Sequence, residues 1–259
     1  MPMDDPPITL EVCVDSLCSA KLAAENGAQR IELNSALELG GLTPSIGLVE
    51  HTLEVLRPTG CALIVMARPR PGGFAYRPDD LAVMQREIDR LLDTGVDGIA
   101  LGVLKEDGMI DEHAIRALIQ PVLSTGKDAV FHRAFDLTPD PIEAMDTLID
   151  LGFTRVLTSG QAPTAVQGTS IIRQLVMHAN GRIEVLPGSG INADNAVQLV
   201  RETGCNQVHA SLRQVVEDRS GSRRPEIRFS SPPPEHGFQK VDPEKVAAMV
   251  EALNDMCSG

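Results

Sequence analysis

The chain has 259 residues, of which 42% are hydrophobic and 23% charged, and its formal net charge is −13. This length suits one large domain, and the negative charge would repel a nucleic-acid backbone or an anionic membrane, so we expect neither as a partner. Five cysteines at irregular spacing do not suggest a disulfide framework, and the start of the chain does not resemble a signal peptide, so we expect a cytoplasmic location.

Eight short apolar segments are typical of β-strands, and each precedes a helical segment. We expect the strands at residues 9–14, 30–35, 62–68, 97–102, 129–134, 154–160, 183–190 and 207–211. We expect the helices at residues 16–26, 44–56, 78–94, 112–124, 139–151, 164–179, 193–203 and 243–256. Eight such units in about 250 residues predict a single (β/α)8 TIM-like barrel, with its active site at the C-terminal ends of the strands. The barrel domain spans residues 9–259, after a short flexible tail at residues 1–8.

An internal repeat predicts which strand residues face the barrel interior. Four helices end in a glycine that is followed by a strand, and positions four and six places after that glycine are mostly apolar. Because strand side chains alternate, positions five and seven places on should point inward. These inward residues are Glu32, Ala100, Leu157, His209, Asn34, Gly102, Ser159 and Ser211. The same alternation places Glu11 and Cys13 inside the first strand.

Two acidic residues are therefore expected inside the barrel on adjacent strands. Glu11 and Glu32 should lie close together, because neighbouring strands are only about 4.8 Å apart. Two buried carboxylates raise each other's pKa unless a cation or a proton lies between them. One interpretation is that one of them forms a buried salt bridge with Arg68; the other is that both are catalytic acid/base groups.

Two histidines follow or end strands on the same face. His132 and His209 could each be a general acid or base near neutral pH, a metal ligand or a structural residue. Asp136 could orient Arg133 or His132, or it could cap the next helix. A further hypothesis is a divalent metal held by the carboxylates and His209.

A glycine-rich turn and nearby basic residues suggest an anion site. Gly188, Ser189 and Gly190 follow the seventh strand and precede a helix, an arrangement that can bind a phosphate or carboxylate, although it can also be a simple turn. Ser159 and Ser211 are expected nearby. Arg68 and Arg70 flank the site from the loop after the third strand, so Arg68 is the expected main cation.

The second long connection on this face is residues 213–242, which is rich in arginine, serine and proline. We treat it as a loop after the eighth strand. It could be a disordered surface loop, a lid over the site or a dimer contact.

Six motifs of the chain resemble those of a known family. They are LEVCVDS at 10–16, RIEL at 30–33, GGLTPS at 40–45, RPR and GGF within 68–74, FHRAFD at 131–136 and RVLTSGQ at 155–161. In these motifs the chain resembles the CutC family, the copper homeostasis proteins. The resemblance implies a TIM-like barrel, a cytoplasmic location and a homodimer.

The resemblance also implies a copper site, which rests on cysteines at the ends of the first two strands. Here the first is Cys13, but Asn34 occupies the second position. Cu(I) prefers thiolate ligands, so the substitution weakens a Cu(I) site. Two functions follow: a copper-binding homeostasis protein, or an enzyme doing acid/base chemistry on a small sugar, polyol or sugar-phosphate-like substrate. Either would bind its ligand at the barrel mouth.

Overall fold

The computed structural model describes residues 8–221, 223–224, 226–227 and 237–257. The tail expected at residues 1–8 lies outside the described residues except for Ile8. Eight parallel strands form one sheet: β1 (Thr9–Val14), β2 (Arg30–Leu33), β3 (Ala62–Met66), β4 (Gly98–Leu101), β5 (Asp128–Phe131), β6 (Arg155–Thr158), β7 (Glu184–Pro187) and β8 (Gln207–Ala210). Their order is β7-β6-β5-β4-β3-β2-β1-β8, and a parallel bridge between Gly188 and His209 joins the two ends. The predicted TIM-like barrel is confirmed.

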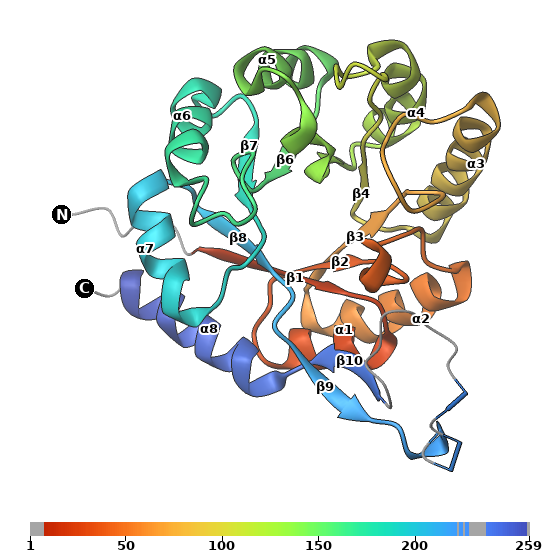
Figure 1. Cartoon of the computed structure of the whole chain (residues 1–259), viewed down its shortest axis with the longest axis vertical. Helices are drawn as coiled ribbons and strands as arrows, with labels where there is room; N and C mark the ends of the chain where they lie inside the picture. The colour runs from red at the N-terminus through yellow and green to blue at the C-terminus, as the bar shows by residue number, and fades with distance from the viewer. Residues whose placement is uncertain (1–7, 222, 225, 228–236, 258–259) are drawn as a thin grey trace.

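Helices surround the strands in a ring (Figure 1). They are α1 (Leu17–Glu25), α2 (Ile46–Leu56), α3 (Pro78–Thr94), α4 (Glu112–Ser124), α5 (Pro141–Leu151), α6 (Thr169–Ala179), α7 (Ala193–Thr203) and α8 (Pro243–Cys257). Short 3-10 turns are η1 (Leu37–Leu39), η2 (Arg57–Thr59), η3 (Arg133–Leu137) and η4 (Arg219–Gly221). Helices α2 and α5 each begin two residues later than their predicted starts at Pro44 and Pro139. The polar residues Ser45 and Asp140 cap their N-termini, so the helices begin directly after them.

The core lies between the strands and the helices, as the glycine repeat predicts. Leu10, Val12 and Val14 of β1 are at most 1% exposed and belong to this outer layer. Inside the barrel, a separate apolar cluster contains only Ile64, Met66, Ala100 and Val130 among the described residues. Leu157, which the repeat also places inside, is buried but lies outside this cluster, and the interior further contains the buried polar residues Glu11, Glu32 and His209.

The segment treated above as a loop begins and ends in strands. β9 (Arg213–Glu217) and β10 (Gly237–Val241) form an antiparallel ribbon that projects from the barrel beside α1 and α8 (Figure 1). Its base is fixed where the buried Val241 donates its N–H to the Ser19 side chain. The prolines at 232–234 lie outside the described residues. The lid and dimer-contact interpretations stay predictions.

In the described part of the chain, no helix is both long enough and apolar enough to cross a membrane.

Candidate functional site

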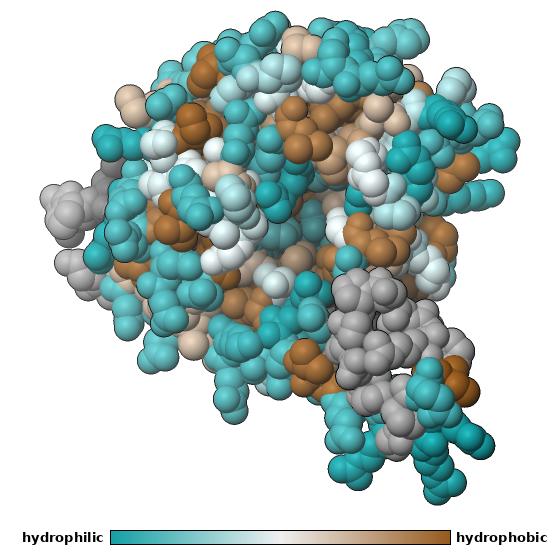
Figure 2. Space-filling model, viewed as in Figure 1, coloured by the Kyte–Doolittle hydropathy of each residue, from teal (hydrophilic) through white to brown (hydrophobic). Residues whose placement is uncertain are grey.

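A cavity of about 370 Å³ lies at the C-terminal mouth of the barrel. This size falls within the range of small-molecule sites. It is lined by Cys13, Glu32, Asn34, Leu37, Gly40, Met66, Arg68, Phe74, His132, Arg133, Leu157, Ser189, Gly190, Ile191, His209, Ala210, Ser211 and Arg213. The space-filling view shows hydrophilic side chains gathered around the middle of the helical ring (Figure 2).

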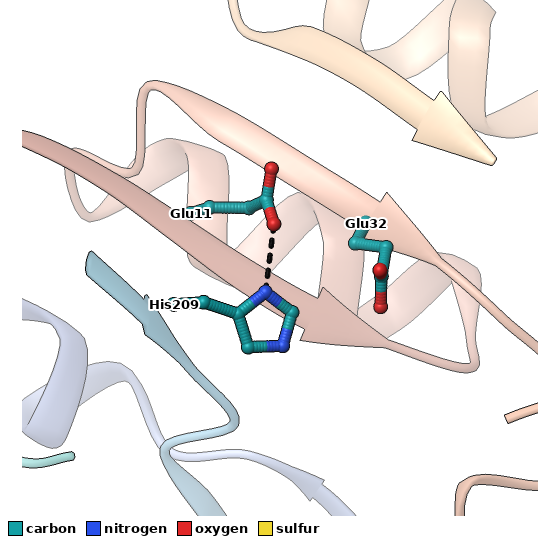
Figure 3. Close-up of side chains that lie close together, drawn as sticks. All are labelled: Glu11, Glu32 and His209. Atoms are coloured by element: carbon teal, nitrogen blue, oxygen red, sulfur yellow. Dashed lines mark hydrogen bonds and ion pairs between the residues drawn. The ribbon is translucent and has the colours of Figure 1, made fainter. Parts of the chain in front are cut away.

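Glu11, Glu32 and His209 meet at the floor of this cavity (Figure 3). Glu11 lies opposite His209 in the β1–β8 register, and its Oε1 is 2.7 Å from His209 Nδ1. The other Glu11 oxygen accepts a hydrogen bond from Arg30 Nε. Glu32 lies on the neighbouring strand β2 and accepts a 2.9 Å hydrogen bond from Asn34 Nδ2. The two predicted inward acids are thus together, but they have different partners.

These partners give the two acids opposite properties. Burial alone would raise the pKa of Glu11, but the positive charge of Arg30 and the hydrogen bond from His209 hold it well below its usual value. Burial raises the pKa of Glu32, and the charge of Glu11 adds to this. Burial would lower the pKa of His209, but Cys13 and the carboxylates of Glu11 and Glu32 raise it well above the usual value. Glu11 therefore favours its charged form, Glu32 its protonated form and His209 its imidazolium form.

His132 is the neutral histidine of the site. Its Nδ1 accepts a hydrogen bond of 3.2 Å from the backbone N–H of Ala134, so the ring proton belongs on Nε2. Burial, followed by the charge of Arg68, lowers its pKa to about 3. Nε2 is buried and has no hydrogen-bond partner among the described residues. This state suits a hydrogen-bond donor to a substrate oxygen better than the general acid or base predicted from sequence.

Among the described residues Arg68 forms no salt bridge with an acid. The buried salt bridge considered from sequence exists, but its cation is Arg30 rather than Arg68. The Arg68 guanidinium donates to the backbone carbonyls of Leu39, Gly41 and Gly72 and lies 5.0 Å from the ring centre of Phe74. Arg30 takes the place beside Glu11, because the strand register puts the two directly opposite each other. Arg68 therefore brings a positive charge to the cavity wall and joins two loops.

Two further arginines line the cavity. Arg133 donates to Asp136 Oδ2 and to Ser159 Oγ, each at 2.8 Å. Arg213, at the start of β9, has a buried Nη1 without a hydrogen-bond partner among the described residues. Among the described residues that line the cavity, Glu32 is the sole carboxylate. In a chain of net charge −13, this wall is therefore locally basic.

Five predicted site residues are not part of the cavity lining: Glu11, Arg70, Asp136, Ser159 and Gly188. Arg70 donates to Asp80 at 3.0 Å and stacks 4.9 Å from the Tyr76 ring centre. Asp136 orients Arg133 rather than His132, and it does not cap α5, whose cap is Asp140. Ser159 donates to the Ala162 carbonyl at 2.5 Å and bonds Asp136 at 2.9 Å. Asp136 and Ser159 both accept hydrogen bonds from Arg133 and so fix its position.

The predicted glycine-rich turn reaches the cavity. Ser189 and Gly190 line it, as does Ser211, whereas Gly188 lies beneath in the bridge with His209. Ser189 and Gly190 have φ angles of 84° and 73°, the left-handed region that rarely suits a serine. The Ser189 hydroxyl is held by the carbonyl of Pro163 at 2.9 Å. The turn is thus a fixed part of the wall.

Sequence reasoning missed a polar layer below the site. Arg30 donates to Gln207, Gln207 donates to Glu184, and Arg155 pairs with both Glu184 and Asp128. The glycine repeat could have found it, because Arg30, Arg155 and Gln207 each lie three places after a repeat glycine. Arg213 was missed because its segment was treated as a loop.

The donor set does not fit Cu(I). Cys13 lines the cavity, but the second position holds Asn34, and the described Cys61 and Cys205 precede β3 and β8 at the opposite end of the barrel. Only Glu11, Glu32 and His209 are close enough for a shared ion among the described residues, within 4.8 Å. Two of these three donors are hard oxygens, which Cu(I) does not favour. A divalent cation would have to displace the Arg30 and His209 contacts of Glu11.

Comparisons with known proteins agree with one another. The model of the CutC family matches residues 8–214. A Treponema denticola protein named "family protein CutC" is 42% identical over 248 residues, which covers 95% of this chain and 99% of the relative. A Rhizobium meliloti protein of the same name is 40% identical over 247 residues, covering 95% of this chain and 96% of the relative.

Two solved structures extend the comparison. The crystal structure of the "Putative Copper Homeostasis Protein CutC" of Streptococcus agalactiae is 35% identical, with a TM-score of 0.75, and covers 79% of this chain and 98% of its own. Thiamine phosphate pyrophosphorylase of Pyrococcus furiosus has a TM-score of 0.58 at 15% identity, covering 96% of each chain. The second likeness shows the barrel fold alone.

Proposed function

Because this chain belongs to the CutC family, we propose that it serves copper homeostasis, the role that the name of its S. agalactiae relative gives. We further propose that it does so as an enzyme acting on a small anionic substrate, rather than by holding copper tightly. The observation that carries this proposal is the cavity wall: Arg68, Arg133 and Arg213 line it with Glu32 as the sole acid among the described lining residues.

The substrate class follows from charge and size. Arg68 and Arg213 form no salt bridge among the described residues, although the charge of Arg213 acts on the half-buried Asp15, so both guanidinium groups can still interact with an anion. Arginine binds phosphate and carboxylate groups in a fixed fork geometry. The turn at Ser189 and Gly190 adds backbone and hydroxyl groups to the same wall. A sugar phosphate, or a small polyhydroxylated acid, would match this wall.

The chemistry at the floor is proton transfer. Glu32 favours its protonated form and can donate a proton to a substrate oxygen. His209, held by Glu11, is a second acid at the same floor. His132 offers a neutral N–H to an oxygen on which charge develops, a role that preorganised donors commonly fill.

Calorimetric titration with inorganic phosphate and with a pentose phosphate tests the anion site. Replacing Arg133 or Arg213 with glutamine should weaken binding about tenfold each, the loss typical of one charged hydrogen bond. Arg116→Gln is the matched control, because that exposed arginine pairs with Glu112 on the surface of α4. Equal affinities for all three variants would contradict the proposal.

A second titration tests copper. Reduced protein, titrated with Cu(I) against a competing chelator, should show no tight stoichiometric site, because Cys13 is the sole described thiol at the mouth. Tight binding that is lost in Cys13→Ser would overturn this part of the proposal.

We also propose a cytoplasmic homodimer. The described cysteines Cys13, Cys18, Cys61 and Cys205 are all free, which suits a reducing compartment. Light scattering on the purified protein and fractionation of cells would test the two statements separately.

A further inference from the structure

One side chain of the cavity has no role in the proton transfers above. Cys13 ends the inward row of β1, two residues after Glu11, and lies opposite Glu32 in the β1–β2 register. Its thiol is free and it lines the cavity. A cysteine that only fills space is normally surrounded by apolar groups. Cys13 instead lies between an acid and a histidine.

His209 connects this thiol to a fixed carboxylate. One side of the imidazole is held by Glu11 through Nδ1 at 2.7 Å, and Glu11 is in turn held by Arg30. Cys13 lines the same cavity as this ring, and its interaction with the ring is one of the causes that raise the pKa of His209. A nucleophile beside a base that a third group orients is the general arrangement of covalent catalysis.

The opposite wall supplies a donor for a carbonyl oxygen. His132 is 3% exposed, lines the same cavity and has an Nε2 without a partner among the described residues. Its ring reaches over the barrel interior because Gly102 lacks a side chain: a Cβ there would lie 2.5 Å from His132 Cε1. The cavity thus combines a sulfur nucleophile, an acid and an unused donor.

We propose that Cys13 is a catalytic nucleophile, oriented by His209 and Glu11, that attacks the carbonyl carbon of a small anionic ester, thioester or amide. The proposal rests on the small-anion site proposed above, and it names the reaction class of that site. In this account Cys13 is a reactive group, and no copper is involved.

The reaction is an acyl transfer to water. In the reactive pair the thiol proton resides on His209. The thiolate forms a bond to the carbonyl carbon, and the π electron pair moves to the oxygen, which accepts a hydrogen bond from His132. As the carbonyl re-forms, the bond to the leaving group breaks and His209 gives that group its proton. Water then loses a proton to His209 and adds to the thioester carbon. The carbon–sulfur bond breaks, and the products are an acid and the protonated leaving group.

Alkylation of the full-length protein at pH 7, followed by peptide mass spectrometry, tests the proposal. With iodoacetamide, Cys13 should react about tenfold faster than the exposed Cys18, as expected for an activated thiol. Cys61 should react slowly, because burial raises its pKa to about 12. His209→Gln should abolish the excess rate at Cys13, and the milder Glu11→Gln should reduce it. Circular dichroism checks that each variant is folded.

Iodoacetate, the anionic counterpart of iodoacetamide, separates the proposed anion site from the proposed Cys13 nucleophile. If the arginines attract anions, the iodoacetate-to-iodoacetamide rate ratio should be about tenfold higher at Cys13 than at Cys18. A fast, His209-dependent Cys13 without this preference would support the nucleophile and remove the anion site. A Cys13 rate no greater than that of Cys18, or one unchanged in folded His209→Gln and Glu11→Gln, would overturn the nucleophile.

Discussion

Replacing Arg30 tests the charge arrangement beneath the site. The Arg30 side chain is 10% exposed and that of its partner Glu11 is 2% exposed, so the pair is almost fully removed from water. Removing one partner of a buried ion pair costs about 3–5 kcal/mol, because the other charge is left without compensation. In Arg30→Met, His209 still contacts Glu11. We therefore expect the lower end, about 3 kcal/mol of unfolding free energy.

A double variant separates the stranded charge from lost packing. Arg30→Met combined with Glu11→Gln keeps a polar group for His209 but removes the unpaired carboxylate, so it should be more stable than Arg30→Met by about 1–2 kcal/mol. The control is Lys21→Met, which removes a surface pair with Glu25 that is 58% and 53% exposed. That change should stay within about 1 kcal/mol of the unmodified protein.

Urea unfolding followed by circular dichroism at 222 nm is the assay, since the chain has no tryptophan and one tyrosine. The pH dependence adds a second readout. The lowered pKa of Glu11 stabilises the fold above its unfolded pKa of about 4.5, and this contribution is lost as pH falls through the lower folded pKa. Arg30→Met should weaken that loss. The reasoning is refuted if Arg30→Met is as stable as the control, or if the double variant is no better than the single one.

Three further outcomes are expected. His132 has a folded pKa of about 3 against an ordinary 6.5, so the protein should lose about 1.4 kcal/mol of unfolding free energy per pH unit as pH falls below 6.5. His132→Asn should flatten the dependence of the urea-unfolding free energy on pH between pH 6.5 and 4.5. An unchanged slope would contradict the buried neutral ring. Asn34→Cys should create a Cu(I) site with Cys13 that chelator competition detects, because both side chains line the cavity; no gain over the unmodified protein would show that the two positions do not converge. Gly102→Ala should destabilise the fold by about 1–3 kcal/mol through overlap with His132, and a neutral effect in thermal unfolding would mean that the ring can move aside.

The barrel and the inward row were predictable because they depend on strong local signals. The glycines that end helices and the alternation of strand side chains place Glu32 and His209 correctly. The start of α6 was predicted five residues early, at 164 rather than Thr169. Residues 165–168 form turns instead of helix, and their amino-acid composition does not distinguish the two.

The partners of each charged side chain were not predictable from the same signals. The expected Arg68–carboxylate pair depends on which arginine lies opposite Glu11, and that is set by strand register rather than by distance along the sequence. The state of His132 depends on a backbone N–H two residues away and on burial. Such contacts are fixed by tertiary packing, which a strand pattern does not contain.

A structure of the protein with a bound sugar phosphate would test the central claim most directly. Our account predicts the phosphate inside the cavity, within hydrogen-bond reach of Arg133, Arg213 or the turn at Ser189 and Gly190, with the sugar toward Glu32 and His209. Phosphate found only on the outer surface, together with a copper ion on Cys13 in crystals exposed to Cu(I), would contradict it.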